Sequence, residues 1–150
     1  MTKQEVLEAL EKAKASHEAQ MGKIETLLNG AEVDAPTPVT KTDCAFGKWF
    51  YDKNNHLEEI LGTQFYSKLD TYHEQWHREY IKIYNIFFKD QKKGLLSTLL
   101  GKNKVDPLLI DKAKMYFTEL QPITKELIHT LEASYRRVNA MSEEKIAHFA

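Results

Sequence analysis

The apolar residues of this 150-residue chain recur at three- and four-residue steps along three long segments. This spacing places side chains on one face of an α-helix, whereas a half-buried strand would show strict alternation. The segments cover residues 3–29, 63–90 and 107–138. Their apolar stripes are Val6, Leu10, Ala13, Met21, Ile24 and Leu28; Phe65 or Tyr66, Leu69, Trp76, Tyr80, Tyr84 and Phe87; and Leu109, Ala113, Tyr116, Leu120, Ile123, Leu127, Leu131 and Val138.

Turn and capping residues separate these segments. Gly30 is expected to end the first helix, and the stretch 31–43, which contains two of the four prolines, is expected to be a crossover loop. Asp43 is expected to cap a short helix that begins at Cys44. Further breaks are expected at 52–55, at Gly62 before a cap at Thr63, and at 89–93. Gly94 and Gly101 are expected to interrupt the helical pattern on either side of the apolar stretch 95–100. Asp106 and Pro107 are expected to begin the last long helix, and Pro122 is expected to kink it.

These features predict an all-α fold, an antiparallel four-helix bundle with an additional short helix. Helices that each carry one apolar stripe bury it by packing against roughly antiparallel neighbours. With 42% hydrophobic residues, a chain of this length can bury one core without staples. We therefore expect residues 1–150 to form a single domain.

The charge pattern excludes several classes of partner. The 21 basic and 22 acidic residues are interspersed and give a formal net charge of −1, so no extended basic field is expected to attract nucleic acid. The N-terminus leads directly into a charged amphipathic pattern, without the long apolar stretch of a signal peptide or membrane span. We expect a cytoplasmic protein that binds neither nucleic acid nor membrane.

Three histidines interrupt the apolar stripes. His17 lies between Ala13 and Met21 in the first stripe, and His73 and His77 lie one helical turn apart in the second. A single core histidine is usually a neutral residue satisfied by hydrogen bonds, but two histidines four residues apart on a helix also present two nitrogens at a spacing that a metal can bridge.

Cys44 is the one cysteine of the chain, which excludes an intramolecular disulfide. At a helix N-terminus the backbone dipole favours the thiolate, although the neighbouring Asp43 carboxylate opposes it. One cysteine and three histidines would complete a closed, tetrahedral zinc site without a water ligand. The other histidines, His56, His129 and His148, are not expected to join it.

Two motifs resemble a known family. They are Cys44-Ala45-Phe46-Gly47-Lys48-Trp49 and His73-Glu74-Gln75-Trp76-His77, with His17 upstream. Together they resemble the chemoreceptor zinc-binding (CZB) domain, over about residues 10–130. The resemblance implies Zn²⁺ as the metal and His17, Cys44, His73 and His77 as its four ligands. The chain departs from the family at Gln20, where a large apolar or aromatic residue is usual.

The resemblance also implies a function. Members of this family are bacterial cytosolic sensors, free-standing or attached to chemoreceptors or diguanylate cyclases. Their zinc site responds to zinc level or to oxidants such as hypochlorous acid. We therefore expect a sensory or regulatory module of signal transduction and chemotaxis, with a role in redox sensing, and not an enzyme. A homodimer is expected because two-fold dimers are the commonest oligomers.

Three alternatives remain open at this stage. A hemerythrin-like di-iron bundle that binds oxygen would need further histidines and bridging carboxylates, which the core stripes do not offer. A zinc hydrolase would use three histidines and an open water position, but it lacks a candidate general base. The third alternative is a metal-free helical interaction domain.

Overall fold

The computed structural model describes residues 1–33, 40–89 and 105–149. These residues form helices, turns and loops, without a strand among them, and the predicted all-α fold class is confirmed. Most of the predicted crossover loop and the apolar stretch 95–100 lie outside the described residues.

Three long helices form the body of the molecule. α1 (Lys3–Leu28) begins at a capping box, in which the Thr2 side chain accepts from the Glu5 backbone and the Glu5 carboxylate accepts from the Thr2 backbone. α4 is Thr63–Tyr84, and α6 is Pro107–Asn139, capped by Asp106. The remaining elements are α2 (Ala45–Phe50), the 3₁₀ turn η1 (Lys53–Asn55), α3 (Leu57–Leu61), the π-helical turn η2 (Asn85–Lys89) and α7 (Glu143–Ala147).

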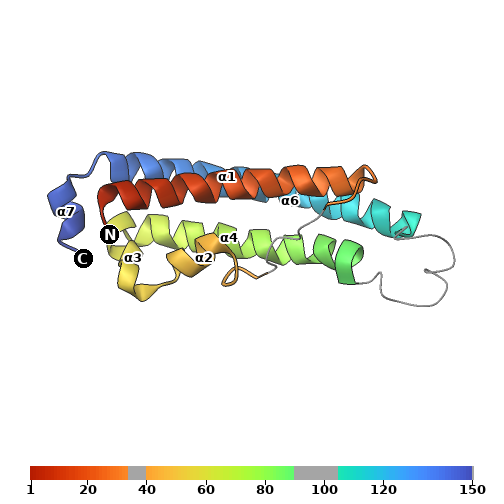
Figure 1. The fold of residues 1–150 in the computed structure, drawn as a ribbon, viewed down its shortest axis with the longest axis horizontal. Helices are drawn as coiled ribbons and strands as arrows, with labels where there is room; N and C mark the ends of the chain where they lie inside the picture. The colour runs from red at the N-terminus through yellow and green to blue at the C-terminus, as the bar shows by residue number, and fades with distance from the viewer. Residues whose placement is uncertain (34–39, 90–104, 150) are drawn as a thin grey trace.

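The long helices lie side by side along the molecule (Figure 1). α1 and α4 begin at the same end and run in the same direction, whereas α6 runs opposite to both. α6 packs against α1 and α4, while α2 packs against α1, and α3 against α4 and α6. The completion of an antiparallel bundle by a fourth helix stays a prediction.

The helix boundaries follow the turn signals with small differences. α1 ends at Leu28 with Asn29 as its cap, and Gly30 has a φ of 87°, a conformation that favours glycine after a helix. The predicted break at Gly62 is also a position of positive φ, 84°, but the prediction that Thr63 caps the next helix is wrong, because Gly62 is the N-cap and Thr63 is the first residue of α4. α6 continues through Pro122, where the predicted kink stays a prediction.

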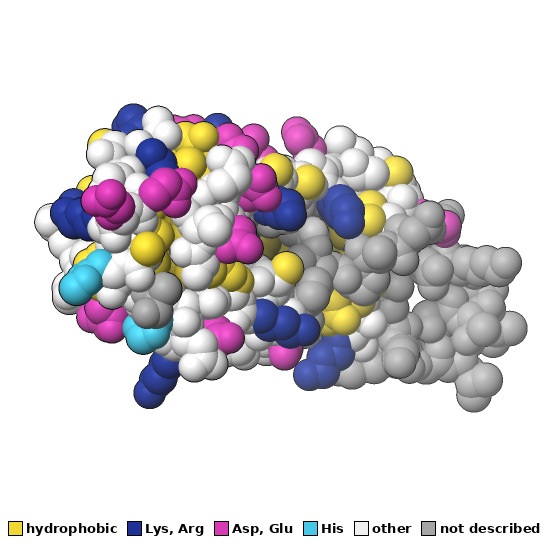
Figure 2. Space-filling view, turned by 60° about the vertical axis from the view of Figure 1, so that its left-hand side comes forward, with side chains coloured by type: hydrophobic (Ala, Val, Ile, Leu, Met, Phe, Trp, Pro, Cys, Tyr) yellow, Lys and Arg dark blue, Asp and Glu magenta, His cyan; other side chains and the backbone are white. Residues whose placement is uncertain are grey.

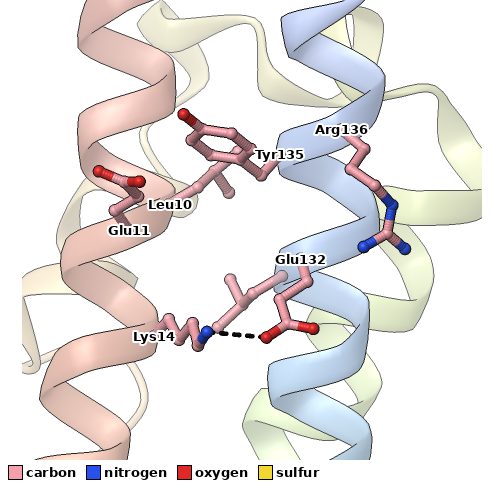
Figure 3. A pocket seen from close by; sticks show the side chains of 7 residues that line it. Leu10, Glu11, Lys14, Glu132, Tyr135 and Arg136 are labelled. Atoms are coloured by element: carbon pink, nitrogen blue, oxygen red, sulfur yellow. Dashed lines mark ion pairs between the residues drawn. The ribbon is translucent and has the colours of Figure 1, made fainter.

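The surface carries charges of both signs. Acidic and basic side chains are interspersed over the face shown in Figure 2. Between α1 and α6, Lys14 Nζ lies 2.7 Å from Glu132 Oε1 (Figure 3). Both side chains are solvent-exposed, so this ion pair contributes little to stability. None of the described helices has the length and apolarity that a membrane span requires.

The core holds the helices together and includes a buried hydrogen bond between α4 and α6. Trp76 is fully buried, and its indole Nε1–H donates to Thr124 Oγ1 at 2.9 Å. The Thr124 hydroxyl in turn donates to the Leu120 carbonyl at 2.8 Å. One side-chain oxygen therefore links α4 to α6 next to the buried histidines, which are packed against the same indole.

Replacing Thr124 by valine should lower the free energy of unfolding by about 1–3 kcal/mol, because the buried indole N–H then loses its acceptor. Thr130→Val is the matched control: Thr130 is also buried on α6, and its hydroxyl donates to Glu126 of the same helix. Chemical denaturation of both variants measures the difference. Equal stability of the two would contradict this role of Thr124.

Candidate metal centre

His17 projects from the middle of α1 into the core. Its Nδ1 lies 2.7 Å from the carbonyl oxygen of Ala13, one turn earlier in the helix. Because a carbonyl can only accept, Nδ1 carries the hydrogen and Nε2 keeps its lone pair. The helix itself thus selects the tautomer in which Nε2 is available to a metal.

His73 and His77 project from successive turns of α4. Their ring centroids lie 4.6 Å apart, and the His17 ring is 5.3 Å from that of His73 and 6.1 Å from that of His77. All three side chains are buried, with exposed fractions of 4% for His17, 0% for His73 and 5% for His77. The structure therefore brings together the three histidines that the sequence placed on core stripes.

Cys44 reaches the same cluster from the start of α2. Its Sγ lies 3.3 Å from His73 Nε2 and accepts the backbone N–H of Gly47 at 3.2 Å. Cys44 is therefore the N-cap of α2, which begins at Ala45, and the prediction that Asp43 caps this helix is wrong. The Asp43 carboxylate instead accepts from the Thr40 hydroxyl at 2.6 Å in the preceding turn. A sulfur that accepts a helix-terminal N–H takes the place that a carboxylate usually occupies.

Gly47 permits the close approach of the turn before Cys44. A Cβ at this position would lie 1.5 Å from the Lys41 carbonyl oxygen and 3.4 Å from Cys44 Sγ. No side chain fits there without displacing the backbone that carries Cys44. The glycine of the cysteine motif is thus explained by packing rather than by its φ angle.

Burial determines the protonation of the cluster. It lowers the pKa of His17, against the effect of the bond to Ala13, and together with the neighbouring histidines and Lys41 it lowers the pKa of His73 to about 2. Burial also raises the pKa of the Cys44 thiol, and this effect is larger than the lowering of the same pKa by the backbone N–H groups at the start of α2. The expected preference for thiolate is therefore not a property of the metal-free site, whereas the neutral imidazoles are in the form that binds metals.

The spacing of the donor atoms fits a small metal ion. One ring nitrogen from each of the three histidines lies within 4.8 Å of the others, and this group can hold a metal ion. Zinc bonds of about 2.0–2.3 Å in tetrahedral geometry place ligand atoms roughly 3.3–3.7 Å apart. The distance of 3.3 Å from Cys44 Sγ to His73 Nε2 is close to that range. The group within 4.8 Å consists of the three histidines, and Cys44 Sγ adjoins it through its contact with His73.

The other histidines lie away from the cluster. His56, His129 and His148 are solvent-exposed. His56 has a left-handed backbone with φ of 51°, and its Nδ1 lies 3.7 Å from Glu59. Among the described residues, the metal-compatible group contains no carboxylate, which a di-iron site would require.

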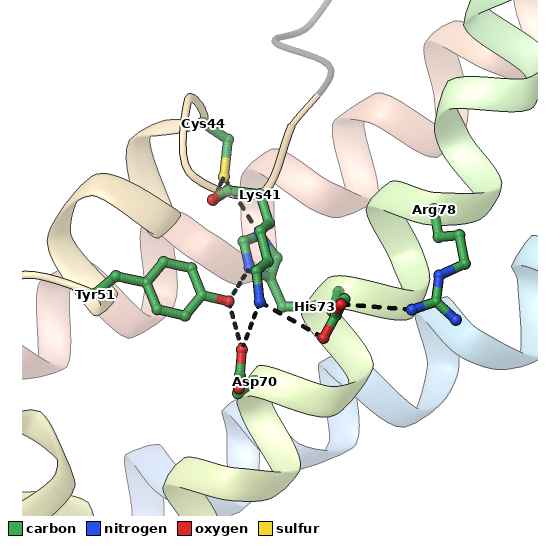
Figure 4. A network of polar contacts seen from close by, with 7 residues as sticks. Lys41, Cys44, Tyr51, Asp70, His73 and Arg78 are labelled. Carbon is green, nitrogen blue, oxygen red and sulfur yellow. Dashed lines mark hydrogen bonds and ion pairs between the residues drawn. The ribbon is translucent and has the colours of Figure 1, made fainter.

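A polar network beside the cluster was not foreseen from the sequence. The Tyr51 hydroxyl donates to Asp70 Oδ1 at 2.8 Å and lies 3.3 Å from His73 Nδ1, and Lys41 Nζ lies 3.1 Å from the same carboxylate oxygen (Figure 4). Burial and the bond to Asp70 raise the pKa of Tyr51. Asp70 precedes His73 by three residues and so shares its helix face, a spacing that could have marked Asp70, though not Tyr51, as a neighbour of the site.

Comparison with known proteins supports the resemblance. Residues 17–84 match the family model described as the chemoreceptor zinc-binding domain. The match is shorter than the predicted span of about 10–130, but it includes all four candidate ligands. The family is a zinc-binding one, and the described residues supply a histidine cluster with an adjacent cysteine that can hold a metal ion. Searches of the curated proteins and of the solved structures find no match.

Gly47→Ala should weaken zinc binding by about 10- to 100-fold, the range typical of changes that misplace a ligand without removing it. It should also lower the free energy of unfolding, because the turn at Lys41 must move. Competition with a chelator measures the first effect and denaturation the second.

Gly22→Ala is the control for this substitution. Gly22 lies within α1, and nothing lies within 4 Å of a Cβ built there. Alanine should raise stability by about 0.5–1 kcal/mol at this position and leave zinc affinity unchanged. If Gly47→Ala behaved in the same way, the close approach to Lys41 would not matter for the site.

Proposed function

We propose that this chain, whose residues 17–84 match the chemoreceptor zinc-binding domain, binds one zinc ion through His17, Cys44, His73 and His77. We further propose that it acts as a sensory or regulatory module of bacterial signal transduction and not as an enzyme. The observation that carries the proposal is the convergence of three buried imidazoles and one buried thiol from three separate elements. In the antiparallel four-helix bundle that we propose, α2 and α3 together would fill the fourth position in place of a long helix.

The four proposed ligands would fill all four positions of a tetrahedral zinc site, without a water molecule. Burial lowers the pKa of His17 and of His73, which favours the neutral imidazoles that bind metals, and the Cys44 thiol gives its proton to solvent when the sulfur becomes a ligand. A bound zinc ion supplies a cross-link between α1, the start of α2 and α4. Binding free energies of about 10–16 kcal/mol are typical of structural zinc, more than enough to bias the packing of these elements.

Two inputs are consistent with this arrangement. In the first, a change in zinc level changes the occupancy of the site. In the second, hypochlorous acid oxidises the Cys44 thiolate to a sulfenic acid and is itself reduced to chloride, which removes one anionic ligand. Either change alters the link between α2 and the long helices.

The output requires a partner. We propose a cytoplasmic homodimer that signals to a chemoreceptor or diguanylate cyclase, because CZB domains occur in signalling proteins of the chemoreceptor type. The interspersed surface charges favour neither nucleic acid nor an anionic membrane as a partner.

Cys44→Ala should weaken zinc binding by roughly 100-fold or more, because one of four ligands accounts for about a quarter of the binding free energy. His73→Ala and His77→Ala should have similar effects, and His17→Ala should fall in the same class. The exposed His129 provides the control, since His129→Ala changes a histidine of α6 outside the cluster.

Elemental analysis and chelator competition measure these effects on protein purified without added zinc. Unchanged affinity in Cys44→Ala would refute the four-ligand site and favour a three-histidine centre. Two irons per chain would favour the di-iron alternative, and the absence of any bound metal would favour a helical interaction domain.

Addition of about one equivalent of hypochlorous acid to the zinc-loaded protein should release zinc, because a sulfenic acid is a weaker ligand than a thiolate. A chromogenic chelator detects the released ion. Cys44→Ala, saturated with zinc at a higher free concentration, should release no additional zinc on oxidation. Equal oxidant-dependent release from both proteins would rule out Cys44 as the oxidised residue.

A further inference from the structure

A continuous chain of polar contacts leads from Asp70 to Cys44. Asp70 Oδ1 accepts from the Tyr51 hydroxyl at 2.8 Å, the Tyr51 oxygen lies 3.3 Å from His73 Nδ1, and His73 Nε2 lies 3.3 Å from Cys44 Sγ. Figure 4 shows the Tyr51 side chain, at the C-terminal end of α2, pointing towards Asp70 and His73 of α4. Each member of this chain can take only a restricted hydrogen-bonding role.

The roles follow from the number of hydrogens available. The Tyr51 hydroxyl has one hydrogen, and it points to the Asp70 carboxylate, which is flanked by Lys41 Nζ at 3.1 Å. Towards His73 the Tyr51 oxygen is therefore an acceptor, so Nδ1 must carry the imidazole hydrogen. Nε2 is then left with a lone pair that faces the Cys44 side of the cluster.

We propose that Tyr51 and Asp70 are positioning residues of the metal centre, which hold His73 in the tautomer and ring orientation that direct Nε2 at the ion. This inference rests on the proposed zinc site and extends it to residues outside the ligand set. Metal-bound histidines commonly donate their second nitrogen to a carboxylate or carbonyl. Here a tyrosine stands between the histidine and the carboxylate.

Two of the three proposed histidine ligands, His17 and His73, thus obtain the same tautomer by different means. His17 donates Nδ1–H to the Ala13 carbonyl of its own helix, which requires no residue outside α1. His73 depends on Tyr51, the residue that caps the C-terminus of α2. The orientation of an α4 ligand is therefore tied to the same short helix that presents Cys44 at its other end.

Lys41 extends this connection to the turn before Cys44. Its Nζ contacts Asp70 at 3.1 Å and Glu74 at 3.5 Å, and its carbonyl oxygen lies 3.5 Å from Cys44 Sγ. The ammonium group also lies 5.0 Å from the centroid of the Tyr51 ring. One residue of the turn therefore contacts both positioning residues and the thiol.

Tyr51→Phe separates the hydroxyl from the packing of the ring. The Tyr51 ring contacts Phe50 at 5.0 Å and the His73 ring at 6.1 Å between centroids, and phenylalanine keeps both contacts. Tyr66→Phe is the matched control. The Tyr66 ring belongs to α4 and stacks on Phe50 at 4.4 Å between centroids, in the same aromatic cluster. Among the described ring pairs, Tyr66 has no contact with His73.

The test uses the full chain loaded with zinc. Chelator competition should show about 10- to 100-fold weaker zinc binding in Tyr51→Phe, the range seen when an outer partner of a ligand is removed. Tyr66→Phe should bind as the unaltered protein does. Asp70→Asn, which removes the charge but keeps an acceptor oxygen, should show a smaller loss in the same direction.

A second readout distinguishes positioning from general support of the fold. In long-range proton–nitrogen NMR spectra, the His73 Nδ1–H signal should move and exchange faster with solvent in Tyr51→Phe, while the His17 Nδ1–H signal should remain. Equal zinc affinity in Tyr51→Phe and Tyr66→Phe, or weaker affinity with an unchanged His73 signal, would overturn the inference. If the unaltered protein bound no zinc, the proposed function itself would fail.

Discussion

The burial of three imidazoles beside one thiol is the constraint on which this structure depends. A buried polar nitrogen is costly unless it has a partner, and here His17 finds one in its own helix while His73 finds its partners in Tyr51 and Cys44. His17 and His73 meet because α1 and α4 face each other through the layer that contains Trp76. The same orientation of α1 and α4 therefore buries the apolar stripes and brings the histidines together. A rotation of either helix that separated the histidines would also expose core residues.

The approach of Cys44 depends on a second constraint, the absence of a side chain at Gly47. The turn at Lys41 packs into the space that a Cβ would occupy, and this contact places the sulfur over His73. The same turn contributes the Lys41 ammonium to Asp70 and Glu74 on α4. The turn at Lys41 therefore has two effects on the site. Its backbone packs against Gly47 and so sets the position of the Cys44 sulfur, and its side chain places a positive charge beside Asp70 and Glu74.

The long helices and the candidate ligands could be predicted from the sequence because both depend on local periodicity. A histidine in an apolar stripe faces the core wherever that helix packs, so His17, His73 and His77 required no knowledge of the fold. The capping role of Cys44 was missed because sulfur is an unusual cap and Asp43 is a common one. Tyr51 was missed because its contact with Asp70 depends on how η1 and α3 return the chain to α4, which no periodicity encodes.

The distribution of the four donors over the elements determines what a change at the site can move. Three of them lie on α1 and α4, which also share the Trp76 layer with α6, so the loss of one ligand leaves these helices joined by their core. Cys44 caps a six-residue helix, α2, whose buried residues are Phe46, Gly47 and Phe50. A change confined to the sulfur therefore acts first on α2 and on the turn at Lys41. Because Tyr51 ends the same helix, movement of α2 would also break the contact between Tyr51 and His73, and in the proposed site a change at one ligand would be passed to a second.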